Sequence, residues 1–471
     1  MQKICFWLLV SIATVIIMTV LISWERHQVS GHLYPYEYDI FDQLARRRNG
    51  GDTTSDIDRS SRCPLHSKPH FLDSPTPNKW QVVQERTYYV YSAHADPRMG
   101  NVTLIRLFGI MPLDRSDGAY QGETFWCQVW INAHGKPHIA EAFLYNQGHA
   151  KEKYLSAQWS CVVDISPDKF SALGVSLVVN NSCNEPTNLL SIHTIRKTDG
   201  YSKRFTICVG GALKREYSNY HQLVEWVEVN RIFGADHVVA YDYNSSAIID
   251  PYVNYYKAAG ILEVIPWSLP NIGDVNSFSL IWNLGQITLI NDCIYRNMYT
   301  SKYIASLDLD EFIVPYGRSG SWLEMMNNAG CGNKPIAIVR NTFFGISTKW
   351  PEDPIYEHDK LVHDVLRLVT LTKTKQDKYV NSFPKRSKFI ARSDVVDTAG
   401  IHNIKQVWAV KNRDLFVCEV ELPYGRLHHY RDPRWKDIEP IKNAFMHKFA
   451  EEIINRTSKV HRDVIWLQDL Q

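Results

Sequence analysis

The feature that most restricts the fold of this 471-residue chain is an alternation of strand-like and helix-like segments after Tyr201. Residues 205–209 form a near-continuous apolar run that ends at Gly210-Gly211, as expected for a strand buried on both faces. Apolar residues at helical spacing follow over 219–233. Further strands are expected at 237–241, 261–265 and 303–307, and a further helix over 284–299. This order predicts an α/β fold whose parallel sheet is covered on both faces and binds ligands at the carboxyl ends of its strands.

The segments around this α/β region have different patterns. Residues 81–200 contain short runs rich in aromatic and β-branched residues, which predict a β-rich, sandwich-like module. Residues 25–80 lack apolar periodicity and contain several prolines, which favours a flexible stem, with a small domain held by Cys63 as the alternative. The α/β domain is expected over 201–435, and a helical extension over 436–471.

An uncharged apolar run extends over 21 residues from Ile4 to Trp24. About 20 such residues span the hydrocarbon core of a bilayer, so we expect a transmembrane anchor. A cleaved signal peptide is the alternative, but the run is long and no A-x-A-like site follows it. Lys3 precedes the run, while Glu25 and Arg26 cancel after it, which favours a cytoplasmic tail of residues 1–3. The rest of the chain is then expected in the lumen of the secretory pathway.

Cysteine content and glycosylation sequons agree with a luminal protein. Of nine cysteines, Cys5 lies in the apolar run, and the other eight suit disulfides, although individual residues could be buried thiols. Glycosylation sequons occur at Asn101, Asn180, Asn244 and Asn455. The 52 basic and 50 acidic residues give a net charge of +2, which does not favour binding to nucleic acid.

Three carboxylates directly follow the predicted strand at 303–307. They are Asp308, Asp310 and Glu311, in the sequence Asp-Leu-Asp-Glu. Neighbouring carboxylates repel one another unless a cation balances them, and Mg²⁺ or Mn²⁺ prefers such oxygen ligands together with substrate phosphates. The motif therefore predicts a divalent metal that grips a diphosphate, with a solvated acidic turn as the alternative.

Two long blocks and two short ones resemble glycosyltransferase family 92. The long blocks are residues 205–270 and 285–315, and weaker matches lie at 89–98 and 427–431. The resemblance implies a type II Golgi membrane enzyme with a GT-A-like, Rossmann-like domain. It further implies a metal such as Mn²⁺, a UDP-sugar donor and β-galactosyl transfer to a glycan acceptor. Asp308 and Asp310 match the family's metal–diphosphate positions.

Other candidate residues are less specific. Asp242, just after the second strand of the α/β region, is expected near uridine, with an ordinary turn residue as an equal alternative. Asn291, Asp292 and Arg296 precede the acidic motif and are expected to face the donor, or else to form buried polar structure. Lys388 and Arg431 could balance a diphosphate, although a solvated surface position is the expectation for both.

The metal shell and the catalytic base have several candidates. His429 is favoured over His402 as a late histidine ligand, and a core position is the alternative for each. An inverting sugar transfer needs a carboxylate that accepts the acceptor's proton, and the candidates are Glu311, Glu352 and Asp353.

Two other functions remain open at the level of sequence. The first is a catalytically inactive glycan-binding protein on the same fold, which the intact acidic motif disfavours. The second is a phosphotransferase, which is disfavoured because the chain has neither a Gly-x-Gly-x-x-Gly loop nor a P-loop motif.

Overall fold

The structure is a computed structural model that describes residues 79–469, except 114–122, 132–135, 148–152, 195, 198, 273–276, 348–352, 357, 409–412 and 433–439. The expected anchor at 4–24 and nearly all of the expected stem lie outside the described residues. Among the helices described, none combines the length and the apolar character needed to cross a membrane.

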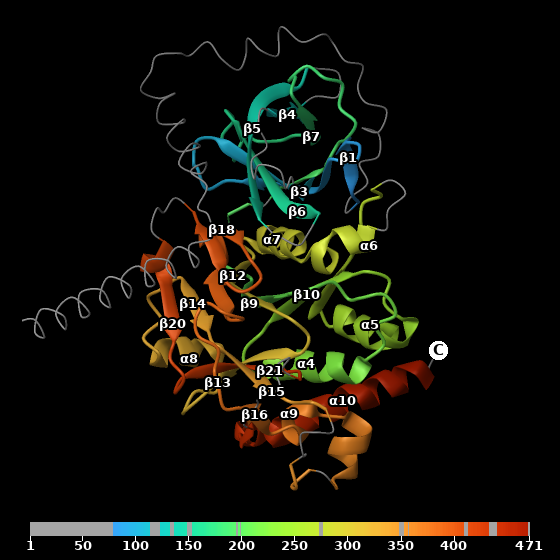
Figure 1. Ribbon diagram of the computed structural model, residues 1–471, viewed down its shortest axis with the longest axis vertical. Helices are drawn as coiled ribbons and strands as arrows, with labels where there is room; N and C mark the ends of the chain where they lie inside the picture. The colour runs from blue at the N-terminus through green and yellow to red at the C-terminus, as the bar shows by residue number, and fades with distance from the viewer. Residues whose placement is uncertain are drawn as a thin grey trace, which may run out of the picture. The chain divides into compact units, whose positions relative to one another are not determined.

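The β-rich module is a single eight-stranded sheet rather than a pair of packed sheets (Figure 1). Its strands are β1 (Gln81–Gln84), β2 (Tyr88–Asp96), β3 (Thr103–Pro112), β4 (Phe125–Trp130), β5 (His138–Gln147), β6 (Tyr154–Val163), β7 (Gly174–Val179) and β8 (Ile192–Thr194). Their order is β1-β2-β3-β6-β5-β4-β7, and β8 pairs with β2. The prediction of a β-rich module is confirmed. The strands form one hydrogen-bonded sheet whose edge strands β1 and β7 lie in contact, and they enclose an apolar core that includes Trp159 and the Cys127–Cys161 disulfide.

The α/β region is built on a seven-stranded sheet in the order β11-β10-β9-β12-β17-β14-β20. The strands are β9 (Lys203–Val209), β10 (His237–Asp242), β11 (Leu262–Pro266), β12 (Ser301–Leu307), β14 (Ile336–Val339), β17 (Lys388–Arg392) and β20 (Val417–Val420). The first four strands of this region, β9 to β12, are mutually parallel. Across the sheet they adopt the order third, second, first, fourth. This is the doubly wound arrangement, and its ligand crevice lies where the order reverses, between the carboxyl ends of β9 and β12. The predicted α/β class is confirmed.

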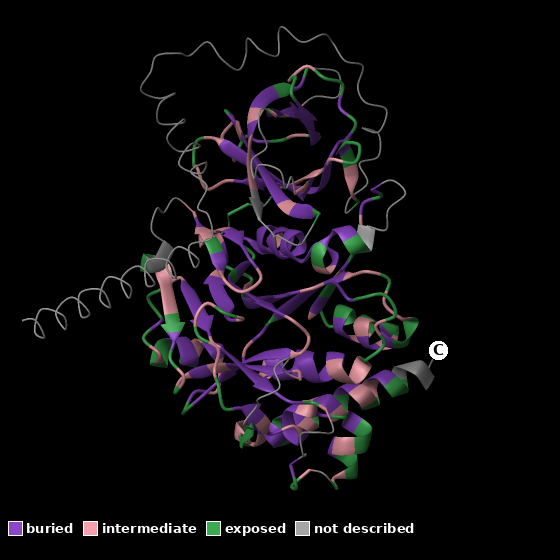
Figure 2. Ribbon diagram, in the orientation of Figure 1, coloured by how far each residue is buried: buried purple, intermediate pink, exposed green. Residues whose placement is uncertain are grey.

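Seven α-helices lie in the described part of the chain, some in direct contact with this sheet and others packed on those helices or on neighbouring segments. They are α4 (Tyr220–Ile232), α5 (Asp250–Ala258), α6 (Ser277–Leu280), α7 (Gln286–Asn297), α8 (Trp322–Asn328), α9 (Val369–Thr372) and α10 (Ala450–Asp469), with short helical turns at 247–249, 282–284, 361–366, 393–395, 413–416 and 445–449. Asn219 caps α4 by accepting a hydrogen bond from the backbone of Gln222, as a short polar side chain does at a helix start. Figure 2 shows α7 and the central strands almost wholly buried.

The carboxyl-terminal segment is not helical throughout. A short strand, β22 (Pro440–Lys442), comes first, and α10 begins only at Ala450. Ile453, Val460 and Val464 of α10 then join the core that contains α4. The expected helical extension is therefore part of the packed α/β core.

A five-stranded sheet in the order β13-β21-β15-β16-β22 lies beyond the acidic motif. Its remaining strands are β13 (Glu311–Pro315), β15 (Asn341–Phe344), β16 (Lys375–Asp377) and β21 (Gly425–Tyr430), and β18 (Val396–Ala399) pairs separately with β19 (Ile404–Val407). The register of β13 and β21 places Glu311 opposite His429, although the two residues are far apart in the sequence.

Disulfides brace the core, as the cysteine content predicted. Cys208 of β9 is joined to Cys293 of α7, and Cys331 to Cys418, while Cys183 is also disulfide-bonded. The first of these bonds fixes α7 against the strand that ends at the ligand crevice.

Buried ion pairs join the β-rich module to the α/β region. Arg106 Nη2 lies 2.6 Å from Asp397 Oδ1, and Arg98 Nη2, which is held by Asp96 of its own module, lies 3.6 Å from the same Asp397 oxygen. Arg98 also donates to the backbone oxygen of Val396. Because each buried charge has a close partner, the module has a defined contact with the α/β region rather than a loose one.

Candidate active site

The acidic motif lies at the point where the strand order reverses. Asp308 follows the last residue of β12, and the backbone N–H of Gly210, just after β9, donates to Leu307 O at 2.7 Å. A Cβ atom on Gly210 would lie 2.6 Å from Asp308 Oδ1, closer than real Cβ atoms approach an oxygen. Glycine is therefore required there for the two strand ends to meet at the aspartate.

A buried lysine balances two of the carboxylates. Lys388 Nζ lies 3.1 Å from Asp308 Oδ2 and 3.0 Å from Glu311 Oε2. Lys388 is fully buried at the start of β17, where a solvated position was expected, so that expectation is wrong. Burial alone would lower the pKa of Lys388, but the two carboxylates outweigh it and raise that pKa. The ammonium is therefore a permanent internal counter-charge.

His429 connects the remaining carboxylates. Its Nε2 lies 3.3 Å from Asp310 Oδ2, and its Nδ1 lies 3.3 Å from Glu311 Oε1 and 3.1 Å from the amide nitrogen of Asn341. Burial opposes ionisation of both residues, yet their contact lowers the pKa of Asp310 and raises that of His429. Because the Asn341 amide nitrogen can only donate to Nδ1, the proton of a neutral His429 lies on Nε2 and faces Asp310, and a metal bound at Nε2 would take the place of that proton.

This donor set fits a divalent metal in part. Among the described residues His429 Nε2 has no hydrogen-bond partner, and the neighbouring carboxylates are ligands that suit Mn²⁺. Within the described part of the chain, no three His, Cys, Asp or Glu side chains converge as a ready-made metal cluster. The pair of Asp310 and His429 is thus the part of the site that already resembles a metal shell.

Two polar side chains near the start of α7 complete the site. Gln286 donates to the backbone oxygen of Gly210 and approaches Asp308 Oδ1 at 3.4 Å. Asn283 donates to Gln286 Oε1 at 2.9 Å. Neither residue was predicted, because an amide in an apolar helix carries no sequence signal of its role. The Gly210-Gly211 pair was interpreted only as the end of a strand, although two glycines there could also have indicated a close approach between strand β9 and the acidic motif.

The predicted donor-side residues have structural partners. Asp292 is fully buried, and its carboxylate accepts from Tyr241 and Arg296 and contacts His94 Nε2 at 2.8 Å. This corrects the expectation that Asp292 and Arg296 face a donor, because they pair with each other beneath the β-rich module. Asn291 likewise bonds the backbone of Ala399 and is buried.

Asp242 occupies the last position of β10. Its Oδ1 accepts from the backbone N–H of Ser245 at 2.9 Å, which is the turn role given as its alternative. A uridine contact by Asp242 stays a prediction.

His402 lies near the site without an ion pair to any described carboxylate. Its backbone oxygen accepts from Ser387, and its buried Nδ1 has no hydrogen-bond partner. Burial, reinforced by Lys388, lowers the pKa of His402 to about 4. Of the two histidines, His429 is the one placed directly against the acidic motif.

Glu311 and Asp353, the two candidates for the catalytic base that the structure describes, both have close polar partners. Glu311 is 2% exposed, and its oxygens face Lys388, His429 and the backbone N–H of Asp308. Asp353 is 1% exposed and binds Thr374 and Lys442. These contacts give both residues structural roles rather than that of a free base. Glu352 lies outside the described residues.

Comparison with known proteins identifies the family. The family description "Glycosyltransferase family 92" matches residues 203–466, more than half of the chain. The chain belongs to glycosyltransferase family 92. The resemblance found in the sequence is therefore confirmed, and the protein is a glycosyltransferase by family.

Among relatives of this family 92 chain is the Beta-1,4-galactosyltransferase galt-1 of Caenorhabditis elegans. It is 22% identical over 375 residues, which cover 77% of this chain and 79% of the relative. A crystal structure of S. aureus TarS covers 48% of this chain and 60% of its own at 10% identity, with a TM-score of 0.26. That score is too low to support an argument about fold. The family match includes the acidic motif, Lys388, His429 and most of α10, whereas the β-rich module precedes it.

Proposed function

We propose that this family 92 glycosyltransferase transfers a hexose, most simply galactose, from a UDP-sugar to a glycan acceptor in a metal-dependent, inverting reaction. The family match and the galactosyltransferase name of the relative support the transferase and the sugar. The observation that carries the proposal is the acidic motif at the reversal point of the sheet, with His429 facing Asp310.

Asp308, Asp310 and His429 are the residues that would hold Mn²⁺. When bound, such a cation supplies stabilisation of the charge that develops on a departing diphosphate. Other residues of the chain position these metal ligands. Glu311 orients His429, and the Lys388 ammonium lies between Glu311 and Asp308 and offsets the repulsion between the two carboxylates.

The acceptor hydroxyl attacks the anomeric carbon on the face opposite the diphosphate, and a carboxylate accepts its proton. Glu311 and Asp353 are enclosed by their partners, so Glu352 is the remaining candidate for this base. Asp242 at the end of β10 is proposed to contact the uridine.

The apolar run at 4–24 is proposed as a single-pass type II anchor that places the enzyme in the Golgi lumen, with residues 25–80 as its stem. Buried disulfides between described cysteines support an oxidising compartment. We propose residues 201–435 as the catalytic domain with a GT-A-like fold, which α10 completes.

The test is UDP release by the full-length chain in detergent. Asp310→Ala should reduce Mn²⁺-dependent release of UDP from UDP-galactose by about 100-fold or more, because a metal ligand is lost. Asp199→Ala, an exposed loop residue, is the matched control and should retain wild-type turnover. Equal turnover by both variants would remove the metal from the proposal. Sugar-dependent binding without any UDP release would instead favour the inactive glycan-binding alternative.

A further inference from the structure

We propose that Trp282, beside the start of α7, forms a subsite for a sugar ring of the acceptor glycan, together with the β-rich module. This inference rests on the proposed function, because it assumes that the acidic motif marks the transfer site. It also gives the module a task, which the family match does not supply.

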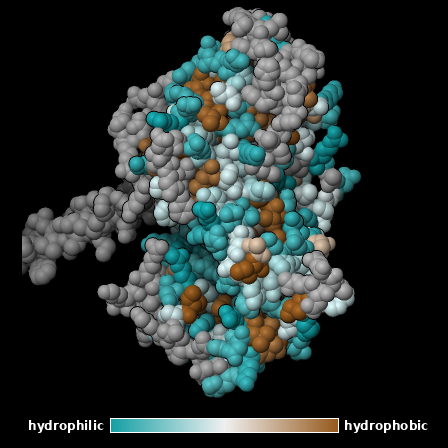
Figure 3. Space-filling model, turned by 90° about the vertical axis from the view of Figure 1, so that its right-hand side faces the viewer, coloured by the Kyte–Doolittle hydropathy of each residue, from teal (hydrophilic) through white to brown (hydrophobic). Residues whose placement is uncertain are grey.

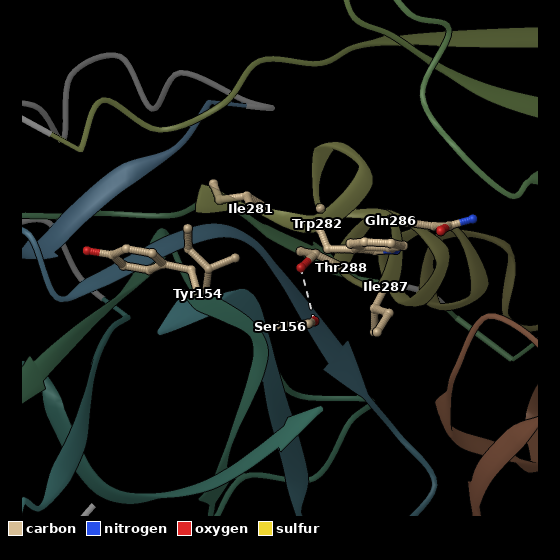
Figure 4. Close-up of a pocket in the computed structure, with 9 residues that line it drawn as sticks. Tyr154, Ser156, Ile281, Trp282, Gln286, Ile287 and Thr288 are labelled. Carbon is tan, nitrogen blue, oxygen red and sulfur yellow. Dashed lines mark hydrogen bonds between the residues drawn. The ribbon is translucent and has the colours of Figure 1, made fainter. Parts of the chain in front are cut away.

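The first observation is an exposed tryptophan at the rim of a hollow. The side chain of Trp282 is 48% exposed, whereas Ile281 before it is buried. The hollow itself is small, with a cavity volume of about 10 Å³, so a ring at this place would lie against the exposed indole rather than inside the hollow. Figure 4 shows the indole beside the first turn of α7, with the Thr288 hydroxyl bonded to Ser156 nearby. The Thr288 hydroxyl is buried and occupied by its hydrogen-bond partners, so the exposed indole is the feature that suits a pyranose, whose C–H face is apolar.

The second observation is the backbone that presents this tryptophan. Asn283, Leu284 and Gly285 have φ values of 42°, 61° and 76° in succession. A glycine adopts this left-handed region freely and an asparagine tolerates it, whereas a leucine is strained there. The Leu284 carbonyl is held by the Trp267 indole N–H at 2.8 Å. Such strain persists only where surrounding contacts enforce it, and it is typical of functional loops.

The third observation connects this loop to the reaction site. Asn283 bonds Gln286, and Gln286 bonds Gly210 and approaches Asp308. Trp282 therefore directly precedes a residue, Asn283, whose side chain is connected through Gln286 to the acidic motif. A glycan whose hydroxyl reacts beside Asp308 would extend its next ring over a residue in this position.

The fourth observation favours the acceptor over the donor. One wall of the hollow comes from Ile110, Tyr154 and Ser156 of the β-rich module, outside the matched residues 203–466. The diphosphate end of the donor is expected at Asp308 and Asp310, within the matched region. Figure 3 shows one face of the molecule, on which hydrophobic patches alternate with hydrophilic surface. At the hollow beside Trp282, the β-rich module can therefore contact a bound glycan.

The experiment measures acceptor and donor use separately in the full-length chain. A panel of methyl glycosides of common pyranoses and disaccharides is first screened with UDP-galactose to find the best acceptor. For Trp282→Ala we expect kcat/KM for that acceptor to fall about tenfold or more, as for loss of a central tryptophan contact. The donor KM and the slow hydrolysis of UDP-galactose without acceptor should stay unchanged. Trp282→Phe should recover part of the loss, and Trp466→Ala, another exposed tryptophan at 62%, is the control.

Each outcome decides between assignments. An unchanged acceptor KM in Trp282→Ala overturns the subsite, and so does a parallel rise of the donor KM, which would place the indole on the donor. If the wild type releases no UDP, the proposed function fails instead. Saturation-transfer NMR with the same methyl glycosides then tests the subsite alone, and equal signals from wild type and Trp282→Ala overturn it. Melting curves of both Trp282 variants verify that they fold.

Discussion

The close approach of Gly210 to Asp308 allows a sharp test of the site geometry. A Cβ at position 210 would lie 2.6 Å from Asp308 Oδ1 and 3.2 Å from the carbonyl carbon of Leu307. An ordinary contact begins near 3.4 Å, so Gly210→Ala has to displace the Asp308 carboxylate by about 0.8 Å. The backbone of Leu307 prevents the new methyl group from moving aside. Lys388 and Gln286 hold the carboxylate on its other sides, so the displacement also disturbs them.

A misplacement of about 1 Å in a reacting assembly can cost on the order of 100-fold in rate. We therefore expect kcat/KM for UDP-galactose to fall 10- to 100-fold in Gly210→Ala, with a loss of about 1–3 kcal/mol in the free energy of unfolding from overpacking. Gly211→Ala is the matched control, because a Cβ there meets nothing closer than 3.6 Å. The assay is UDP release at varied donor and Mn²⁺ concentration, alongside urea unfolding. Equal activity in the two variants would show that Asp308 does not act from this position.

Two further predictions concern buried charges. Lys388→Met should lower the free energy of unfolding by about 3–5 kcal/mol, because it leaves the buried Glu311 carboxylate without its lysine partner. Adding Glu311→Gln to this variant should restore part of the lost stability. Urea unfolding measures both variants, and a loss below about 1 kcal/mol in Lys388→Met would contradict the ion-pair role. Burial raises the pKa of Glu225 from 4.5 to about 7, partly offset by hydrogen bonds from Thr370 and Val369. A raised folded pKa contributes stability below pH 4.5 that is lost as the pH rises through 7, so the wild type should lose about 3 kcal/mol across this window relative to Glu225→Gln. Parallel pH profiles of the two proteins would refute this.

The α/β fold was predictable because its information is local. The apolar run at 205–209 and the helical spacing at 219–233 match β9 and α4 within about two residues. The acidic motif could be predicted as a site in the same way, since three carboxylates that follow a strand need a positive charge nearby. The sequence could not show that this charge includes a lysine about 80 positions later, because only the antiparallel pairing of β12 with β17 brings Lys388 there.

The expectation for the C-terminal region was limited in the same way. His429 was favoured from a short resemblance, but its partner is decided by the register of β13 against β21, which opposes it to Glu311. Residues 440–442 form a strand because β16 offers a free edge, a long-range contact that local helical spacing does not reveal. Tertiary pairing therefore overrides local preference at the points where the site is assembled.

The misplaced donor residues have a geometric explanation in α7. A helix that returns across a parallel sheet begins at the edge where the strands end, so its first turn faces the ligand crevice. Gln286 is in that turn and contacts Gly210. At 1.5 Å per residue, Asp292 and Arg296 lie about 9 and 15 Å further along the axis. Asp292 and Arg296 are therefore close to the acidic motif in the sequence but distant from it in space. The reason is that the residues just before β12 lie at the edge of the sheet opposite to the one where β12 ends. In this fold, polar residues at the start of such a helix are the stronger candidates for contact with a ligand.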